Sequence, residues 1–254
     1  MTADEYVNNV LAKYQVQTGQ GTPAYTAAQA VYSIIQAWAG TALQEVSFSG
    51  SYAKGTGVRG TTDVDLFISL KSSTTNTLKE IFDSLHSHII SKRYIARKQN
   101  VSIHITHNGI EMDLVPGVNQ VGNTNDHWLY VNKSGRERTQ TNINKHIELV
   151  RNSQRVNEIK AIKIWRKLNN LDFPSFYLEM AVIEALRGRR SDQLAGNVWE
   201  ALRYLSDGFK NARFIDPANT NNIISDDLTV AEKNVIANRA ASSRAQQNWE
   251  NVIW

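Results

Sequence analysis

The sequence is most informative at Phe48-Ser49-Gly50-Ser51, which is followed twelve residues after Ser51 by Asp63-Val64-Asp65-Leu66. In the second part, two aspartates alternate with apolar residues, which is the pattern of a half-buried β-strand. Residues i and i+2 of a strand point to the same face, so we expect Asp63 and Asp65 to project side by side. Neighbouring carboxylates repel each other unless a cation lies between them, and hard divalent cations prefer oxygen ligands. The stretch therefore predicts one half of a metal site.

The Gly-Ser pair that precedes the aspartates indicates a second kind of ligand. It closes an apolar run, and a turn at Gly50 and Ser51 would present backbone N–H groups and a hydroxyl. Such groups are suited to binding the oxygens of a polyphosphate. Gly50 and Ser51 are therefore predicted to bind a nucleotide, and the whole pattern is predicted to hold a nucleoside triphosphate through Mg²⁺.

A third carboxylate is predicted on a β-hairpin further along the chain. Two alternating runs, residues 101–105 and 110–115, flank Asn108-Gly109, which is the commonest pair in a two-residue type I′ turn. Asp113 stands between two apolar residues in the second run, a position that is usually apolar in a buried strand. Pro116-Gly117 is expected to end this strand.

Three carboxylates together predict a catalytic metal site. A two-metal site for in-line phosphoryl transfer needs about three carboxylates around ions roughly 3.5–4 Å apart. Asp63, Asp65 and Asp113 are thus predicted both as catalytic residues and as the ligands of two Mg²⁺ (or Mn²⁺) ions. An isolated Asp-x-Asp on a strand is more often a solvated face, so the prediction depends on the conjunction of the motifs. No histidine spacing adds a metal site, and His104 is expected to be an ordinary strand-surface residue.

At these residues the chain resembles the polymerase-β-like nucleotidyltransferase superfamily. Residues 50–56 (GSYAKGT), 63–66 (DVDL) and 112–116 (MDLVP) are similar to the branch of oligoadenylate synthases, cyclic GMP–AMP synthase, bacterial cyclic-oligonucleotide synthases (CD-NTases) and archaeal CCA-adding enzymes. The resemblance implies an α/β fold in which a mixed sheet flanked by helices shares a cleft with an all-helical C-terminal part. Strand patterns also fade in the second half. We therefore predict a catalytic core with N-terminal helices at residues 1–140 and a helical, oligoadenylate-synthase-like domain at residues 141–254.

The helical part contains a second group of candidate residues. A helix is predicted over residues 159–167, with Lys163 on a basic face that would ordinarily be solvated. The resemblance implies instead that Lys163 reaches the triphosphate of the donor nucleotide, a task suited to a compact ammonium group. It also implies that Ser175 bonds a phosphate and that Phe176 stacks on the base, although Ser175 could simply cap a helix. Lys163, Ser175 and Phe176 are therefore predicted nucleotide-binding residues.

Composition excludes several classes of protein. The chain of 254 residues has no cysteine, which excludes disulfides, thiol catalysis and a cysteine-ligated zinc site. No run approaches the roughly 20 apolar residues of a membrane span, and Asp4 and Glu5 precede any apolar stretch, unlike in a signal peptide. We therefore expect a cytoplasmic protein without membrane contact. The formal net charge of +4 allows a polyanionic ligand but does not demand a long nucleic-acid track.

The resemblance implies an enzyme that uses an NTP as donor and releases pyrophosphate. The favoured acceptor is another nucleotide, so that NTPs are joined into a linear or cyclic oligonucleotide second messenger, as in antiviral signalling. An alternative is template-independent addition of nucleotides to RNA or tRNA 3′ ends; RNA binding is not favoured because the net charge is mild. A third is a catalytically silent nucleotide or RNA sensor, for which a missing carboxylate would be expected. NTPs are the predicted partners, and an activating ligand or protein is left open.

Overall fold

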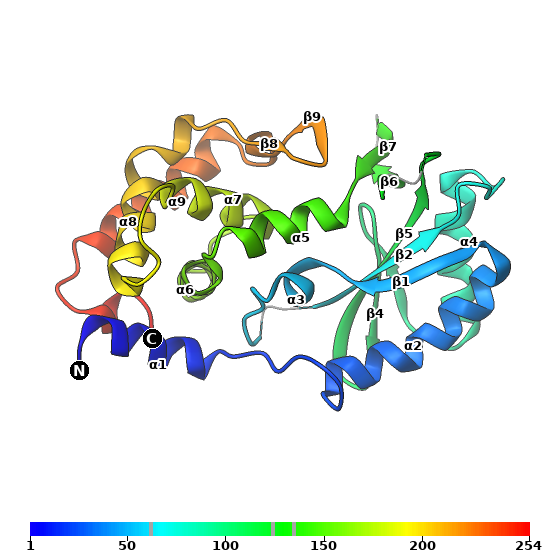
Figure 1. Ribbon diagram of the computed structural model, residues 1–254, viewed down its shortest axis with the longest axis horizontal. Helices are drawn as coiled ribbons and strands as arrows, with labels where there is room; N and C mark the ends of the chain where they lie inside the picture. The colour runs from blue at the N-terminus through cyan, green and yellow to red at the C-terminus, as the bar shows by residue number, and fades with distance from the viewer. Residues whose placement is uncertain (61–62, 123–124, 134–135) are drawn as a thin grey trace. The chain divides into compact units, whose positions relative to one another are not determined.

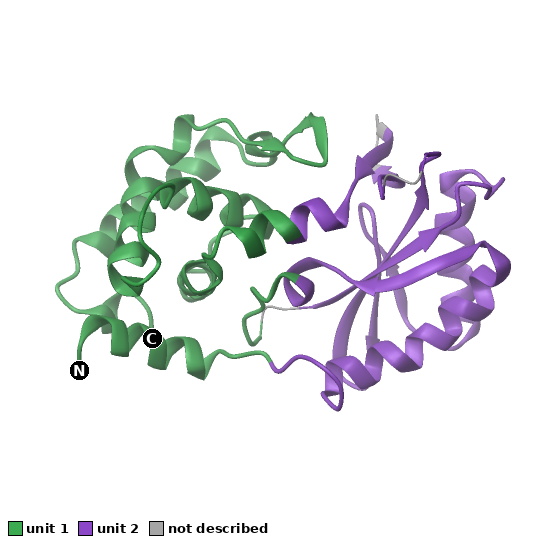
Figure 2. Cartoon of the chain, in the orientation of Figure 1, with its two compact units in different colours: residues 1–16, 54–62, 148–254 green, residues 17–53, 63–147 purple. Residues whose placement is uncertain are grey.

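The computed structural model describes residues 1–60, 63–122, 125–133 and 136–254. Its contacts divide the chain into two compact units, which Figure 2 shows in different colours. Unit 1 comprises residues 1–16, 54–62 and 148–254, and unit 2 comprises residues 17–53 and 63–147. Unit 1 thus joins most of the predicted helical domain to two earlier segments, and the domain boundary at residue 140 stays a prediction.

Unit 2 is built on a mixed sheet, which confirms the predicted α/β class (Figure 1). The strand order is β1-β2-β5-β4-β3, with β6 paired to β5 and β7 paired to β6. Strands β2 and β5 are parallel, and the other pairs are antiparallel. The strands are β1 (Leu43–Phe48), β2 (Val64–Leu70), β3 (Ala96–Lys98), β4 (Ile103–His107), β5 (Ile110–Asn119), β6 (His127–Lys133) and β7 (Arg136–Thr141).

Helices α2 (Pro23–Ala39) and α4 (Leu78–Ser91) pack on one face of this sheet. Their starts follow from local sequence: the Thr22 side chain accepts an N–H bond and Pro23 stands at the first helical turn, while Thr77 and Glu80 form a capping box. Apolar residues of both helices form one core with every second residue of β2, β4 and β5. The residues between them, which include Asp65, project from the opposite face of the sheet.

The predicted type I′ hairpin is confirmed. Asn108 and Gly109 have φ angles of 49° and 76°, both in the left-handed region that this turn requires. Strands β4 and β5 pair antiparallel on either side of the turn, with His107 opposite Ile110. The turn therefore fixes which residues of the two strands lie side by side.

The prediction that Pro116-Gly117 ends the second strand is wrong, because β5 continues to Asn119. Proline has no N–H to donate to a neighbouring strand, so it is tolerated only where a partner is missing. Pairing of β5 with β4 stops at Leu114, and pairing with β6 begins at Gly117. Pro116 thus stands where β5 changes its antiparallel partner.

Unit 1 is mainly helical, and Trp165 and Tyr177 are among its largest fully buried side chains. The Trp165 ring N–H donates to the Ser243 hydroxyl at 2.9 Å, so the indole is buried with its polar atom satisfied. Helix α5 (Ile143–Asn152) runs from unit 2 into unit 1. The other elements of unit 1 are α1 (Ala3–Lys13), α6 (Val156–Leu168), α7 (Ser175–Ala185), α8 (Leu194–Asp207), β8 (Ile215–Asp216), β9 (Asn219–Ile223) and α9 (Val230–Arg244).

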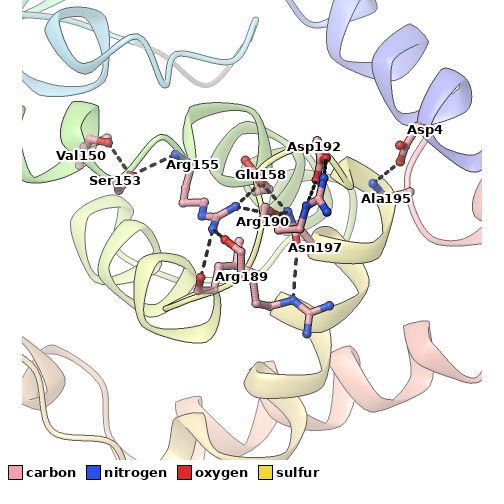
Figure 3. A network of polar contacts seen from close by, with 11 residues as sticks. Asp4, Val150, Ser153, Arg155, Glu158, Arg189, Arg190, Asp192, Ala195 and Asn197 are labelled. Carbon is pink, nitrogen blue, oxygen red and sulfur yellow. Dashed lines mark hydrogen bonds and ion pairs between the residues drawn. The ribbon is translucent and has the colours of Figure 1, made fainter.

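A buried polar network joins three of these helices (Figure 3). The Arg155 guanidinium, just before α6, donates to Glu158 and to the Leu186 carbonyl, both at 3.2 Å. The amide of Asn197 on α8 donates to the same Glu158 carboxylate at 3.0 Å. Arg155 and Glu158 are both buried, and each neutralises the charge of the other, which would be costly to bury unpaired. The network fixes the end of α7 and the start of α8 against α6.

In the part of the chain that the structure describes, no helix combines the length and apolarity needed to span a membrane.

Candidate functional site

The three predicted carboxylates lie together on the sheet face opposite α2 and α4. Asp65 on β2 is in direct register with Asp113 on the parallel strand β5, and Asp63 immediately precedes β2. Asp63, Asp113 and His104 each offer a ligand atom, and these atoms all lie within 4.8 Å of one another. Alternation and strand register thus bring the three predicted carboxylates to one face, but the group whose ligand atoms come this close contains His104 and does not include Asp65.

The electrostatics of Asp63 show that the carboxylates are crowded. Partial burial and then the charge of Asp113 raise the pKa of Asp63 above its ordinary value, against the opposing effect of His104. A divalent cation would relieve this repulsion, and carboxylate oxygens are the ligands that Mg²⁺ and Mn²⁺ prefer. The donor set therefore fits a hard divalent metal.

Gly50 lies directly against one of the carboxylates. Its φ is +55°, and a Cβ placed on it would lie 1.7 Å from Oδ2 of Asp65. The neighbouring Ser49 N–H donates to the Asp65 carbonyl at 2.8 Å. Only glycine therefore fits here, both for its backbone conformation and for the contact. Ser51 follows in the first turn of the short helix α3 (Gly50–Lys54), so the predicted phosphate-binding pair lies beside the predicted metal ligand.

His104 has a role that our reading of the sequence missed. Instead of being an ordinary strand-surface residue, it is directly opposite Asp113, and its Nδ1 lies 2.9 Å from Asp113 Oδ1. Its Nε2 lies 2.7 Å from Glu111, which also accepts from the Thr106 hydroxyl at 2.9 Å. Burial lowers the pKa of His104, but hydrogen bonds and charges from the two carboxylates outweigh it and raise the pKa overall. The hairpin register could have predicted this neighbour of Asp113.

Lys163 of α6 lies in the core of unit 1, and its side chain is 2% exposed. It donates to Glu179 at 2.6 Å and to the Thr56 hydroxyl at 3.0 Å. Glu179 also accepts from Lys54 at 2.8 Å, so one buried carboxylate faces two ammonium groups. Burial alone would raise the pKa of Glu179, but these two cations bring it down to about 2. Lys54 was not predicted, because its partner is far away in sequence.

Ser175 and Phe176 begin α7 on the same unit. Ser175 makes no capping bond; its hydroxyl accepts from Arg166 at 3.1 Å instead. The Lys54 ammonium lies 4.4 Å from the centre of the Phe176 ring, in cation–π contact. Thus Lys163 and Phe176 are linked in unit 1 through Lys54 and Glu179, and Ser175 is held by Arg166, while unit 2 gathers the carboxylates and the Gly-Ser turn.

Comparison with known proteins gives a consistent result. The profile of the Second Messenger Oligonucleotide or Dinucleotide Synthetase domain matches residues 1–153, more than half of the chain. No curated relative matches the sequence.

Solved structures share the fold over nearly the whole chain. CdnC of E. coli MS115-1, solved with ATP, is 16% identical, with a TM-score of 0.75 over 98% of this chain and 96% of that one. CdnG of Bradyrhizobium diazoefficiens, in complex with GTP, is 13% identical, with a TM-score of 0.74 over 95% and 89%. The CdnE cyclic dinucleotide synthase of Elizabethkingia meningoseptica is 12% identical, with a TM-score of 0.70 over 97% and 100%. The chain belongs to the second messenger oligonucleotide or dinucleotide synthetase family, within the polymerase-β-like nucleotidyltransferases.

Proposed function

We propose that this protein is a metal-dependent enzyme that joins NTPs into a linear or cyclic oligonucleotide, with Asp63, Asp65 and Asp113 as its catalytic residues. The observation that carries the proposal is the placement of these three carboxylates on one sheet face, with Gly50 against Asp65. A silent sensor would not need all three. The complete set therefore supports catalysis over sensing.

In the proposed mechanism, Asp63, Asp65 and Asp113 would hold two Mg²⁺ or Mn²⁺ ions. Bound ions of this kind neutralise the triphosphate and acidify the attacking hydroxyl. Asp113 either receives the proton of that hydroxyl or serves as a ligand alone. Gly50 and Ser51 would bind phosphate oxygens through an N–H and a hydroxyl, on the side of Asp65 that faces β1.

We propose that the residues gathered in unit 1 bind the donor nucleotide. Lys54 and Lys163 share a single carboxylate, Glu179, so the three buried groups keep a formal charge of +1. Burial lowers the pKa of Lys163, which Glu179 holds in the core, so this charge supports a direct role toward phosphates for Lys54 in particular, with Lys163 beside it. Phe176 would stack on the base and Ser175 would bond a phosphate, with Arg166 holding the hydroxyl.

The substrates that we propose are NTPs, and two of the structurally similar proteins were solved with ATP and with GTP. CdnC was also solved in complex with a HORMA-deltaN protein, and on that precedent we propose that this enzyme binds a protein partner. Addition of nucleotides to RNA 3′ ends is the less favoured alternative, because RNA tailing requires many phosphate contacts and the net charge is only +4.

The test is product formation by the purified protein from α-³²P-labelled NTPs with Mg²⁺ or Mn²⁺. Without RNA, we expect short labelled oligonucleotides that resist phosphatase if they are cyclic and retain a 5′-triphosphate if they are linear. The same reactions with tRNA added decide between the two acceptors. Label that appears only at the tRNA 3′ end would contradict the proposal in favour of RNA tailing.

A further inference from the structure

A cavity with a volume of about 670 Å³ lies at the β3–β4 edge of the sheet in unit 2. Its lining is strongly basic and polar. The lining residues that matter here are Lys92, Arg93, Arg97, His104, His107 and Asn108.

The cavity opens on the same sheet face as the catalytic carboxylates. His104 is opposite Asp113 on β5 and also opposite Arg97 on β3. Asp65, Asp113, His104 and Arg97 therefore form one row across four adjacent strands. Lys98, the next residue after Arg97, points to the other face, where it pairs with Asp83 of α4 at 2.5 Å. The cavity thus continues the row of catalytic side chains beyond Asp113.

The cations of the cavity outnumber the acidic groups near them. Among the described residues, Lys92, Arg93 and Arg97 make no ion pair within 4 Å, and the nearest acidic influence is Glu111, which contacts His104 and interacts electrostatically with Arg97. Exposed cations elsewhere commonly have a partner, such as Lys79 with Asp83. Unpaired cations around a concave surface raise the local concentration of anions. The cavity is therefore suited to a phosphorylated ligand.

Position distinguishes this cavity from the phosphate-binding turn at Gly50. Gly50 lies against Asp65, toward β1, whereas the cavity lies beyond Asp113, toward β3. The carboxylates stand between the two. Strands are spaced about 4.8 Å apart, so Arg97 lies roughly 10 Å from Asp113 across two strand intervals. A triphosphate chain that extends from a ribose whose hydroxyl is at Asp113 spans a comparable distance.

We propose that this cavity binds the 5′-phosphates of the acceptor nucleotide, with Arg93 and Arg97 as the principal phosphate ligands. The inference rests on the proposed function and adds to it where the acceptor is held. The volume of the cavity lies within the range of pockets for small molecules and cofactors, about 300–1,000 Å³. Arginine is suited to this task because its planar guanidinium can donate two parallel N–H bonds to a phosphate.

The experiment measures how strongly the enzyme prefers an acceptor that carries 5′-phosphates. The donor is an α-³²P-labelled 2′,3′-dideoxynucleoside triphosphate, which has no hydroxyl and so cannot itself accept. Each ribonucleoside triphosphate is compared with its own nucleoside as acceptor, and the ratio of the two kcat/KM values is taken. We expect the double variant Arg93→Ala, Arg97→Ala to lower this ratio at least about tenfold, which is the factor for losing one charged hydrogen bond. Lys98→Ala, the matched control on the other face of β3, should keep the wild-type ratio.

The outcomes separate this inference from the proposed function. A double variant that keeps the wild-type ratio, or a Lys98→Ala variant that loses it equally, would overturn the acceptor site while leaving the enzyme's activity established. An acidic partner protein would then be the better ligand for the cavity. Wild-type protein that transfers label to no acceptor would overturn the proposed function, and the inference with it.

Discussion

Replacing Glu179 by glutamine should destabilise the protein strongly. In the wild type, this carboxylate accepts from Lys54 at 2.8 Å, from Lys163 at 2.6 Å and from the Thr56 hydroxyl at 2.8 Å. Its side chain is 1% exposed, and those of the two lysines are 8% and 2% exposed. Glutamine keeps the shape but removes the charge, which leaves two buried ammonium groups without a counter-ion.

The expected loss and its pH dependence follow from two routes. Breaking a buried ion pair by removing one partner costs about 3–5 kcal/mol. Burial lowers the pKa of Lys163, which opposes the pairing, whereas the pKa of Glu179 falls from 4.5 to about 2, which favours it. Because the pKa of Glu179 is depressed in the folded state, this stability is fully present above about pH 4.5 and is lost as the pH falls toward 2. The first route gives a loss of about 3–5 kcal/mol at pH 7, and the depressed pKa of Glu179 gives its dependence on pH.

The assay is urea denaturation followed by tryptophan fluorescence, at pH 7 and again near pH 3. Glu184→Gln is the matched control, because Glu184 is on the same helix but is 38% exposed in its pair with Arg187. An exposed pair contributes about 0–1 kcal/mol. The difference between wild type and Glu179→Gln should shrink at the lower pH. If the two variants lose similar stability at pH 7, the buried charge cluster does not have the role assigned to it.

Three further predictions concern the metal site. Asp63→Asn should make the metal-free protein at least as stable as wild type at neutral pH, because a carboxyl whose pKa is raised by folding destabilises the fold once it is charged. Melting curves in EDTA at pH 3 and pH 7 test this. A variant that is less stable than wild type at pH 7 alone would contradict it. Gly50→Ala should abolish nucleotide transfer, because the new Cβ would overlap the Asp65 carboxylate, and turnover near that of wild type would show that the turn can move away. His104→Asn should weaken Mn²⁺ binding by about 10–100-fold, as is typical when the partner of a metal ligand is lost. Electron paramagnetic resonance titration measures that affinity, and an unchanged value would mean that His104 does not orient Asp113.

Much of the candidate metal site could be predicted from local sequence rules. Strand alternation places Asp65 and Asp113 on the same face, and parallel pairing of β2 and β5 brings them into register. The position of His104 was also predictable, because a two-residue turn at Asn108-Gly109 places residue 104 opposite residue 113. We missed it by judging His104 from its own spacing rather than from the register of the hairpin.

Other features depend on contacts between distant segments. Lys54 and Glu179 are 125 positions apart, and no local pattern indicates that they form an ion pair. A second ion pair of Glu179, with Lys163, explains why Lys163 is buried, although helical periodicity alone places it on an ordinary basic face. The continuation of β5 past Pro116 likewise depends on β6, a strand that local sequence does not assign as a partner.

The proposed roles of Asp63, Asp65 and Asp113 in nucleotide transfer are measured by the turnover of variants that lack two of these carboxylates. Turnover of α-³²P-labelled NTPs with Mg²⁺ or Mn²⁺ is compared between wild type and the double variant Asp63→Asn, Asp65→Asn. The single variant Asp83→Asn on α4 is the folded control. We predict labelled oligonucleotides from wild type and the control, and a loss of several orders of magnitude in the double variant, whose unfolding midpoint stays near that of wild type. Turnover near the wild-type rate in the double variant would contradict the account.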